Sequence, residues 1–143
     1  MKNIFIIVLT SITLNLNANS ISFDDCISNL SIFAEYAKVK NYDSAYDPWV
    51  AVKNECPDLN SAIYIYGERI LKDFIKNSEG DKKVKFQSDL INLYDEWLTY
   101  FPKTKSGKSQ VGKILAIKGQ SMVDDKLAKS EEVFEVFDHA CKN

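Results

Sequence analysis

Histidine and arginine are almost absent from this chain of 143 residues, which contains one of each, His139 and Arg69. A single histidine excludes histidine-rich metal sites and leaves little for acid–base catalysis near neutral pH. A single arginine leaves almost no means of holding a phosphate or carboxylate through two parallel hydrogen bonds. We therefore expect a protein that is not an enzyme and that has no cofactor and no metal ion.

Glycine and proline are also scarce, at five and three residues. Their scarcity, together with 27% charged residues, favours helices over a β-sandwich or a β-barrel. The 18 Lys and Arg residues are outnumbered by 20 Asp and Glu residues, so the positive excess typical of nucleic-acid-binding proteins is missing. With 45% hydrophobic residues, the chain can bury one core, either as a single domain or as a short repeat array.

The first twenty residues have the layout of a secretory signal peptide. Lys2 precedes an apolar stretch that reaches Leu16, and Ala18-Asn19-Ser20 places small residues at −3 and −1 of a cut after Ser20. A membrane anchor is the less favoured alternative, because polar residues interrupt the stretch and it is shorter than the ~20 apolar residues that span a bilayer. We predict a signal peptide at 1–20 and a mature chain at 21–143 that has no membrane span and is exported to the periplasm, the cell surface or the medium.

The rest of the sequence predicts an all-α fold. Apolar residues recur at steps of three and four, and no segment shows a sustained alternation with a period of two. The pattern predicts six helical segments, at 23–40, 42–56, 61–77, 81–101, 110–127 and from 130 onward.

Three positions near the predicted helix ends have specific expectations. Asn41 is expected to take the left-handed conformation of a tight turn between the first two segments. Pro48 lies inside the second segment, so either Asp47 caps a shorter helix or the helix kinks there. Ser130 is expected to cap the sixth helix.

Pairs of helices along a chain call for a test for internal repeats. In the first pair, spacings of nine, four and eight residues match the aromatic, alanine, aromatic and proline positions of the tetratricopeptide repeat (TPR). These positions are Tyr36, Ala45, Trp49 and Pro57. A second repeat is anchored by Gly67, Tyr94 and Pro102. Its two halves lie about eleven residues further apart than in the TPR consensus, so the region 77–85 is expected to hold a longer loop or extended helices. A third repeat is anchored by Gly119, and both glycines take the position at which the two helices of one repeat come closest.

On these positions the chain resembles the exported TPR-containing proteins of Gram-negative bacteria. The motif elements that carry the resemblance are Asn41-Tyr42 with Ala45, Glu55-Cys56-Pro57 and Tyr64-Ile65-Tyr66-Gly67. The resemblance implies antiparallel helical hairpins stacked as a short right-handed solenoid. Its repeats would cover 26–59, 60–104 and 110–143, the last allowed to be truncated. The alternative is an ordinary helical bundle whose aromatic residues fall in register by chance.

The TPR register also places two of the three cysteines. Cys26 takes the first position of its repeat and Cys56 the thirty-first, and in an antiparallel hairpin the start of the first helix lies beside the end of the second. In an exported protein we therefore expect a disulfide between them. Two buried free thiols are the alternative. Cys141 is left over and is expected to be free.

Other chemical motifs are weak. The segment 102–109 ends in the Gly-Lys-Ser of a P-loop, but it begins with Pro102, which has no amide hydrogen, and it follows a predicted helix instead of a strand. We interpret it as a solvated basic loop. Adjacent acidic pairs, such as Asp24-Asp25 and Asp124-Asp125, point in different directions on a helix and are interpreted as solvated faces or helix starts.

The resemblance implies a non-enzymatic interaction module or scaffold. TPR arrays bind peptides or partner proteins with an inner face formed by the first helix of each repeat. The predicted inner face of the second and third repeats comprises Tyr64, Glu68, Lys72, Lys113 and Gln120, together with Ala116. Tyr64 is the preferred anchor, because tyrosine offers a large contact area and a polar tip.

The inner face of the first repeat differs from the other two, because its residues, Ile27, Leu30, Ala34 and Ala37, are all apolar. Two other functions stay open at this point. One is a small exported helical enzyme that uses the lysine-rich loop, and the other is a passive structural domain of a longer envelope protein.

Overall fold

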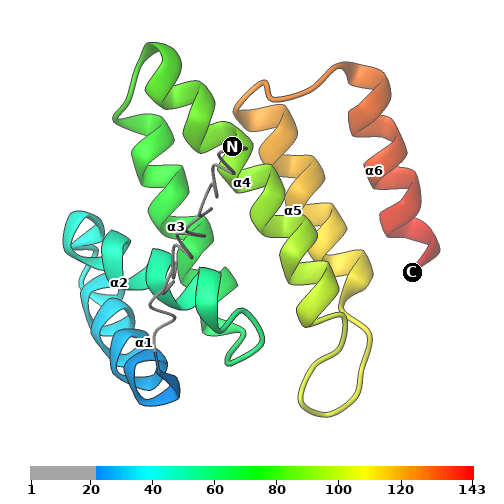
Figure 1. The fold of residues 1–143 in the computed structure, drawn as a ribbon. Coiled ribbons are helices and arrows are strands. Elements are labelled where there is room, and N and C mark those ends of the chain that lie inside the picture. The colour runs from blue at the N-terminus through cyan, green and yellow to red at the C-terminus, as the bar shows by residue number, and fades with distance from the viewer. Residues whose placement is uncertain (1–21) are drawn as a thin grey trace, which may run out of the picture.

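The computed structural model describes residues 22–143, and over that range the chain forms six α-helices and no β-strand. The helices are α1 (Phe23–Lys38), α2 (Tyr42–Glu55), α3 (Ala62–Lys76), α4 (Gly80–Tyr100), α5 (Val111–Asp124) and α6 (Ser130–Lys142) (Figure 1). The predicted all-α class is confirmed, and each helix ends within three residues of its predicted bounds. The predicted signal peptide, 1–20, lies outside the described residues.

The helices pair as three antiparallel hairpins, α1–α2, α3–α4 and α5–α6, which stack in chain order as predicted (Figure 1). The first hairpin joins the second through α2 and α3, with α1 also reaching α3, and the second joins the third through α4 and α5. Between the described helices, α3 and α5 are not packed against each other, and α6 packs on α5 alone. The third hairpin is therefore attached through one helix pair.

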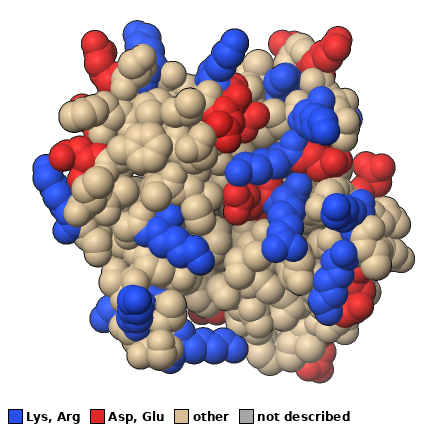
Figure 2. Space-filling model, turned by 180° about the vertical axis from the view of Figure 1, so that it is seen from behind, with Lys and Arg blue, Asp and Glu red and all other residues tan. Residues whose placement is uncertain are grey.

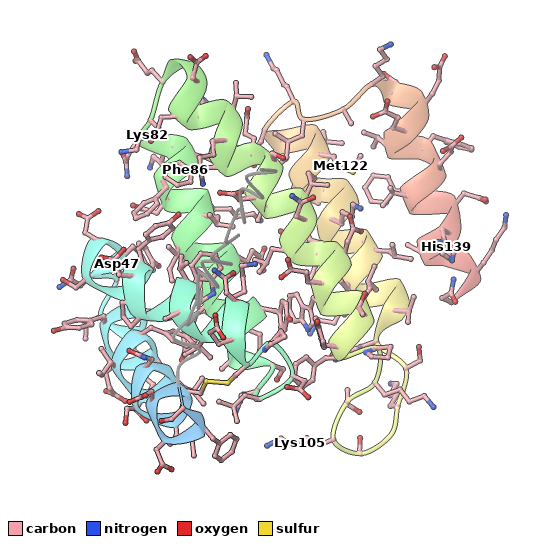
Figure 3. The ribbon with its side chains drawn as sticks, in the orientation of Figure 1. Asp47, Lys82, Phe86, Lys105, Met122 and His139 are labelled. Carbon is pink, nitrogen blue, oxygen red and sulfur yellow. A yellow bond between two sulfur atoms is a disulfide. The ribbon has the colours of Figure 1, made fainter. Side chains whose placement is uncertain are left out.

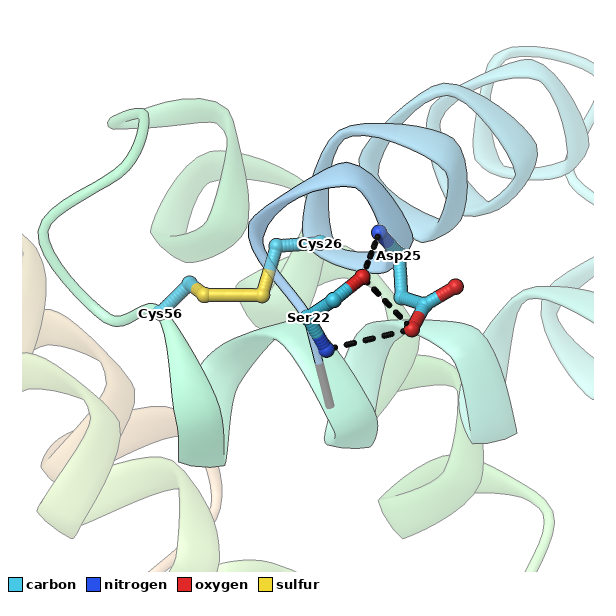
Figure 4. The surroundings of a disulfide bond; sticks show 4 residues. All are labelled: Ser22, Asp25, Cys26 and Cys56. Carbon is cyan, nitrogen blue, oxygen red and sulfur yellow. Dashed lines mark hydrogen bonds between the residues drawn. A yellow bond between two sulfur atoms is a disulfide. The ribbon is translucent and has the colours of Figure 1, made fainter. Parts of the chain in front are cut away.

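Two interactions hold the start of α1 in place, a capping box and a disulfide (Figure 4). Ser22 and Asp25 form a capping box, in which the Ser22 hydroxyl accepts from the Asp25 amide at 3.1 Å and the Asp25 carboxylate accepts from the Ser22 amide at 3.1 Å. Cys26 then forms a disulfide with Cys56, directly after α2, across a Cα–Cα distance of 6.4 Å. The predicted disulfide is confirmed, and Cys141 is an exposed free thiol.

Two of the predicted helix-end roles are wrong. Lys40, not Asn41, takes the left-handed conformation, at φ 60°, because Asn41 caps α2 by accepting a hydrogen bond from the Ser44 amide at 3.3 Å. Ser130 is the first residue of α6 and makes no capping bond, since Lys129 occupies the N-cap position. Pro48 lies inside α2, which runs unbroken from Tyr42 to Glu55.

The core is an aromatic-rich cluster that runs through the first two hairpins and reaches α5 at Ile114. Trp49 is buried in it, and its indole Nε1 donates to the Ile63 carbonyl at 2.8 Å, which ties α2 to α3. The rings of Tyr46 and Phe74 lie 5.1 Å apart across the same junction. The greater separation of the two halves of the second repeat does not come from a long loop, because only residues 77–79 join α3 to α4. Most of it comes from α4, which at 21 residues is longer than α2 at 14 residues.

Two of the predicted repeat positions do not have the role expected of them. Gly67 was expected where the two helices of its own hairpin come closest, but a Cβ there would lie 2.7 Å from the Trp49 indole of the preceding hairpin. Tyr36 was expected at a packing position and is 40% exposed. Gly119 is placed as predicted, because a Cβ there would lie 2.9 Å from the Phe137 ring of the same hairpin.

Candidate partner-binding surface

The predicted anchor, Tyr64, is a core residue. Its side chain is fully buried, its ring stacks on that of Trp97 at 6.1 Å between centroids, and its hydroxyl donates to the Pro57 carbonyl at 3.0 Å. Burial raises the pKa of Tyr64 well above its ordinary value. The prediction that Tyr64 contacts a partner is wrong, because α3 is turned so that this side chain faces α4 of its own hairpin.

Glu68 and Lys72, also predicted on the inner face, lie at the edge of the same helix. They form an ion pair at 2.8 Å, with Glu68 mostly covered and Lys72 partly exposed. Beside them, the hydroxyls of Tyr94 and Ser121 share a buried hydrogen bond of 2.8 Å that links α4 to α5. Burial raises the pKa of Tyr94, and the negative charge of Glu68 acts in the same direction.

Asp125, at the end of α5, completes this group. Burial raises the pKa of its carboxyl, and the Lys72 ammonium on α3 opposes the shift, so the two charges act on each other although their helices are not packed together. Gln87 on α4 donates to the Asp125 carbonyl at 3.1 Å. We refer to Glu68, Lys72, Tyr94, Ser121 and Asp125 as the inter-hairpin polar cluster.

Sequence reasoning missed two members of this cluster. Asp124-Asp125 was interpreted as a solvated pair or a helix start, whereas Asp125 is half-buried at the end of a helix. Ser121 follows Ile114 by seven residues, so its place on the apolar face of α5 could have been read from the helical period. It is the one fully buried polar residue among those that the structure describes.

Lys113 and Gln120 lie on an exposed stripe of α5. They share it with Ala116 and Val123, since steps of three and four bring these residues to one helix face, and all four are exposed. The opposite side of α5 is packed between α4 and α6. Of the predicted inner-face residues, Glu68 and Lys72 therefore form an ion pair on α3, and Lys113 and Gln120 share one exposed face of α5. The inter-hairpin polar cluster lies where α3, α4 and the end of α5 come near one another.

The apolar inner face predicted for the first hairpin is divided between core and surface. Ala37 is buried, Leu30 and Ala34 are half-buried, and Ile27 is exposed. The buried side of α1 is rotated from the predicted one and includes Cys26 and Phe33. This face therefore offers a partner little beyond Ile27 and its neighbours.

The lysine-rich segment 102–109 is a loop between α4 and α5, as predicted. Its backbone bonds are internal, with the Thr104 amide donating to the Lys108 carbonyl at 2.8 Å, and Gly107 has a φ of 82°. A pocket of about 470 Å³ lies between this loop and the start of α3, lined by Lys103, Lys105 and Phe101 among others. Figure 3 labels Lys105 in the loop and shows it far from His139 on α6.

Two kinds of feature, a metal site and a membrane-spanning helix, can be checked for in the described part of the chain. It contains no cluster of three His, Cys, Asp or Glu residues able to hold a metal ion. None of the helices in residues 22–143 combines the length and the apolar character that a bilayer crossing requires. On the face seen in Figure 2, positive and negative side chains are interspersed around uncharged areas.

Comparisons with known proteins add no assignment. No protein-family model, curated protein or solved structure matches the chain.

Proposed function

We propose that this protein is an exported, non-enzymatic interaction module of the TPR type. A protein or peptide partner binds the exposed stripe of α5, and the Glu68–Lys72 pair lies near the end of that helix, where Lys72 acts on Asp125. The observation that carries the proposal is the stripe itself. Lys113, Ala116, Gln120 and Val123 offer charge, hydrogen bonding and apolar area on a helix that is packed on both sides. A surface held in this way loses little conformational entropy when a partner binds.

The TPR assignment is supported by the stacked hairpins and by the burial of Ala45 and Trp49 in the first hairpin. The close approach of Gly119 to Phe137 in the third hairpin supports it as well. Export is supported by the Cys26–Cys56 disulfide, because disulfides persist in oxidising compartments and are rare in the cytosol.

Site-specific photocrosslinking in the native cell envelope tests the proposal. A photoreactive amino acid at Lys113 or at Gln120 should give a discrete crosslinked product with one partner. The matched control is the same amino acid at Thr99, which is exposed on α4. Crosslinking of equal pattern and yield from all three positions would contradict a binding role for the stripe, and so would an absence of product from Lys113 and Gln120.

A further inference from the structure

Helix α6 presents an exposed face that does not contact the rest of the described chain. None of its residues is fully buried, and Phe134 is 72% exposed, whereas Phe137 packs against α5 at Gly119. Asp138 and Cys141 follow Phe134 by four and seven residues, so the three side chains share one side of the helix. We call Phe134, Asp138 and Cys141 the free face of α6. Figure 3 shows Met122 between α5 and α6, and Figure 1 shows α6 at the outer edge of the stack.

The second helix of the preceding hairpin contains an equivalent face. In α4, Leu90, Tyr94 and Trp97 pack inward, and Val133, Phe137 and Ala140 of α6 have the same spacing 43 residues later (94 to 137). This alignment pairs Ile91 with Phe134, Asp95 with Asp138 and Leu98 with Cys141.

In α4 this face receives the next hairpin. The Lys118 ammonium of α5 pairs with the Asp95 carboxylate at 2.6 Å, and Ile91 lines a pocket with Leu127 beyond the end of α5. Leu98, on the same face, packs against the core. The third hairpin, which packs on this face of α4, thus supplies an apolar residue, Leu127, and a lysine, Lys118, that pairs with Asp95.

In α2 the equivalent face also receives the next hairpin. Ala45, Trp49 and Val52 of α2 have the same steps of four and three as Val133, Phe137 and Ala140, and this aligns Tyr46 with Phe134. Tyr46 packs on Phe74 and Phe86 at 5.1 and 6.1 Å between ring centroids. Lys53 on this face pairs with Glu96 of α4 at 3.1 Å. Both preceding hairpins therefore use this face to dock a following element, through one apolar contact and one ion pair.

We propose that the free face of α6 is a docking site for a helix of a partner protein. That helix carries an apolar stripe and places a lysine or arginine opposite Asp138, as α5 places Lys118 opposite Asp95. The charge of α6 fits such a partner, because the helix contains four acidic residues, Glu131, Glu132, Glu135 and Asp138, and one lysine, Lys142. In the described structure Asp138 pairs with Lys142 one turn away, and an incoming cation would replace that exposed pair.

A second copy of this chain fits the free face less well. The corresponding unfilled surface of its first hairpin is on α1, where Ile32 and Tyr36 lie beside Ser31 and Glu35. Stacking that surface on α6 would bring the Glu35 carboxylate, which already pairs with Lys38 at 2.6 Å, toward an acidic helix and would supply no unpaired cation for Asp138. The site lies on another helix than the α5 stripe, and it does not depend on the function proposed above.

The first experiment supplies a known helix. The full chain is extended after Asn143 by a second copy of residues 101–143, so that the appended α5 follows α6 as α5 follows α4. We expect one cooperative urea transition with a larger m-value than that of the parent chain. Asp138→Lys should lower the transition midpoint of the extended chain, and Lys118→Asp in the appended copy should restore it. Glu135→Lys, the same charge change on another side of α6, is the matched control.

Two results would overturn the docking site: unfolding of the appended hairpin in a separate transition, or equal effects of Asp138→Lys and Glu135→Lys. The occupant is tested with a photoreactive amino acid at Phe134 in the native envelope. A product with another protein, mapped to a peptide that contains lysine or arginine and lost in Asp138→Lys, supports the proposal. A covalent dimer of this chain, or no product, contradicts it.

Discussion

At the scale of single residues, the buried aromatic side chains differ in whether their polar atoms are satisfied. Tyr64 donates to Pro57, Tyr94 is bonded to Ser121 and Trp49 donates to Ile63. The indole Nε1 of Trp97 is buried without a hydrogen-bond partner in the described residues. A buried polar atom costs little when it is paired and about 1–3 kcal/mol when it is not.

The two tryptophans therefore predict different effects for the same substitution. Trp49→Phe removes the indole donor to the Ile63 carbonyl and with it a buried hydrogen bond between α2 and α3, whereas Trp97→Phe removes a donor that had no acceptor. We expect Trp49→Phe to reduce the free energy of unfolding by about 1–3 kcal/mol more than Trp97→Phe. Urea denaturation of both variants measures the difference, and equal losses would show that ring volume alone matters.

Gly67 gives a second prediction at this scale. Replacing an exposed glycine in a helix by alanine stabilises the helix by up to ~1 kcal/mol. Here the new Cβ would lie 2.7 Å from the Trp49 indole, so Gly67→Ala should instead destabilise the protein by about 1–3 kcal/mol. The combination with Trp49→Phe should cost less than the sum of the two single variants, because the smaller ring makes room. A raised melting temperature for Gly67→Ala would contradict the packing described here.

At the scale of elements, the end of α5 carries charge of the wrong sign for a helix. Asp124 and Asp125 lie where the backbone dipole is negative, and acidic residues are unfavourable there. Lys72 of α3 compensates Asp125 in part. The half-buried carboxyl of Asp125 is thus tolerated at a junction between two hairpins, next to the hydroxyl pair of Tyr94 and Ser121.

This position predicts a pH-dependent gain of stability. The pKa of Asp125 is raised above its ordinary value of 3.8, so the ionised carboxylate is less favourable in the folded chain than in the unfolded one. Its contribution to stability falls as pH rises from 3.8 through the folded-state pKa. Asp125→Asn should therefore stabilise the protein at pH 7, by about 0.3–1 kcal/mol, and have little effect below pH ~3. Melting temperatures at both pH values test this, and a gain of equal size at low pH would contradict it.

At the scale of the whole molecule, the hairpins are held less firmly from the first to the third. The first hairpin is closed by a disulfide and shares a continuous core with the second. The third is joined through α4 and α5, and α6 has no fully buried residue. We expect the stack to loosen first at α6.

Removal of the disulfide tests the first hairpin. Its two cysteines are 30 residues apart, and closing such a loop is worth roughly 3–4 kcal/mol in the chain-entropy model. Replacing Cys26 and Cys56 by alanine should lower the free energy of unfolding by about that amount, whereas Cys141→Ala should leave it unchanged. Urea denaturation measures the loss, and non-reducing peptide mapping checks the pairing. A Cys56–Cys141 linkage would show that the pairing described here is wrong.

The amino-acid sequence by itself predicted the six helices, with bounds within three residues of those observed, and its resemblance to TPR proteins implied the pairing of Cys26 with Cys56. Helices are set by the spacing of apolar residues three and four apart and by Pro and Asn at their ends, which are local rules. The disulfide was expected from the TPR register, which places Cys26 at the start of the first helix and Cys56 at the end of the second helix of one hairpin. These features depend on residues that are close in sequence or joined by a short connection.

The tertiary structure alone decided which side of each helix is buried. Tyr64 was expected on the partner-binding face and is buried against α4, and Gly67 was expected against its own hairpin and lies against Trp49. Tyr36 was expected inside and is exposed, and Asp125 was not expected near Lys72. An apolar pattern wider than one stripe allows more than one rotation of a helix. Packing against residues distant in sequence sets the rotation of each helix, here the indole of Trp49 against Gly67. The local spacing of apolar residues does not predict that contact.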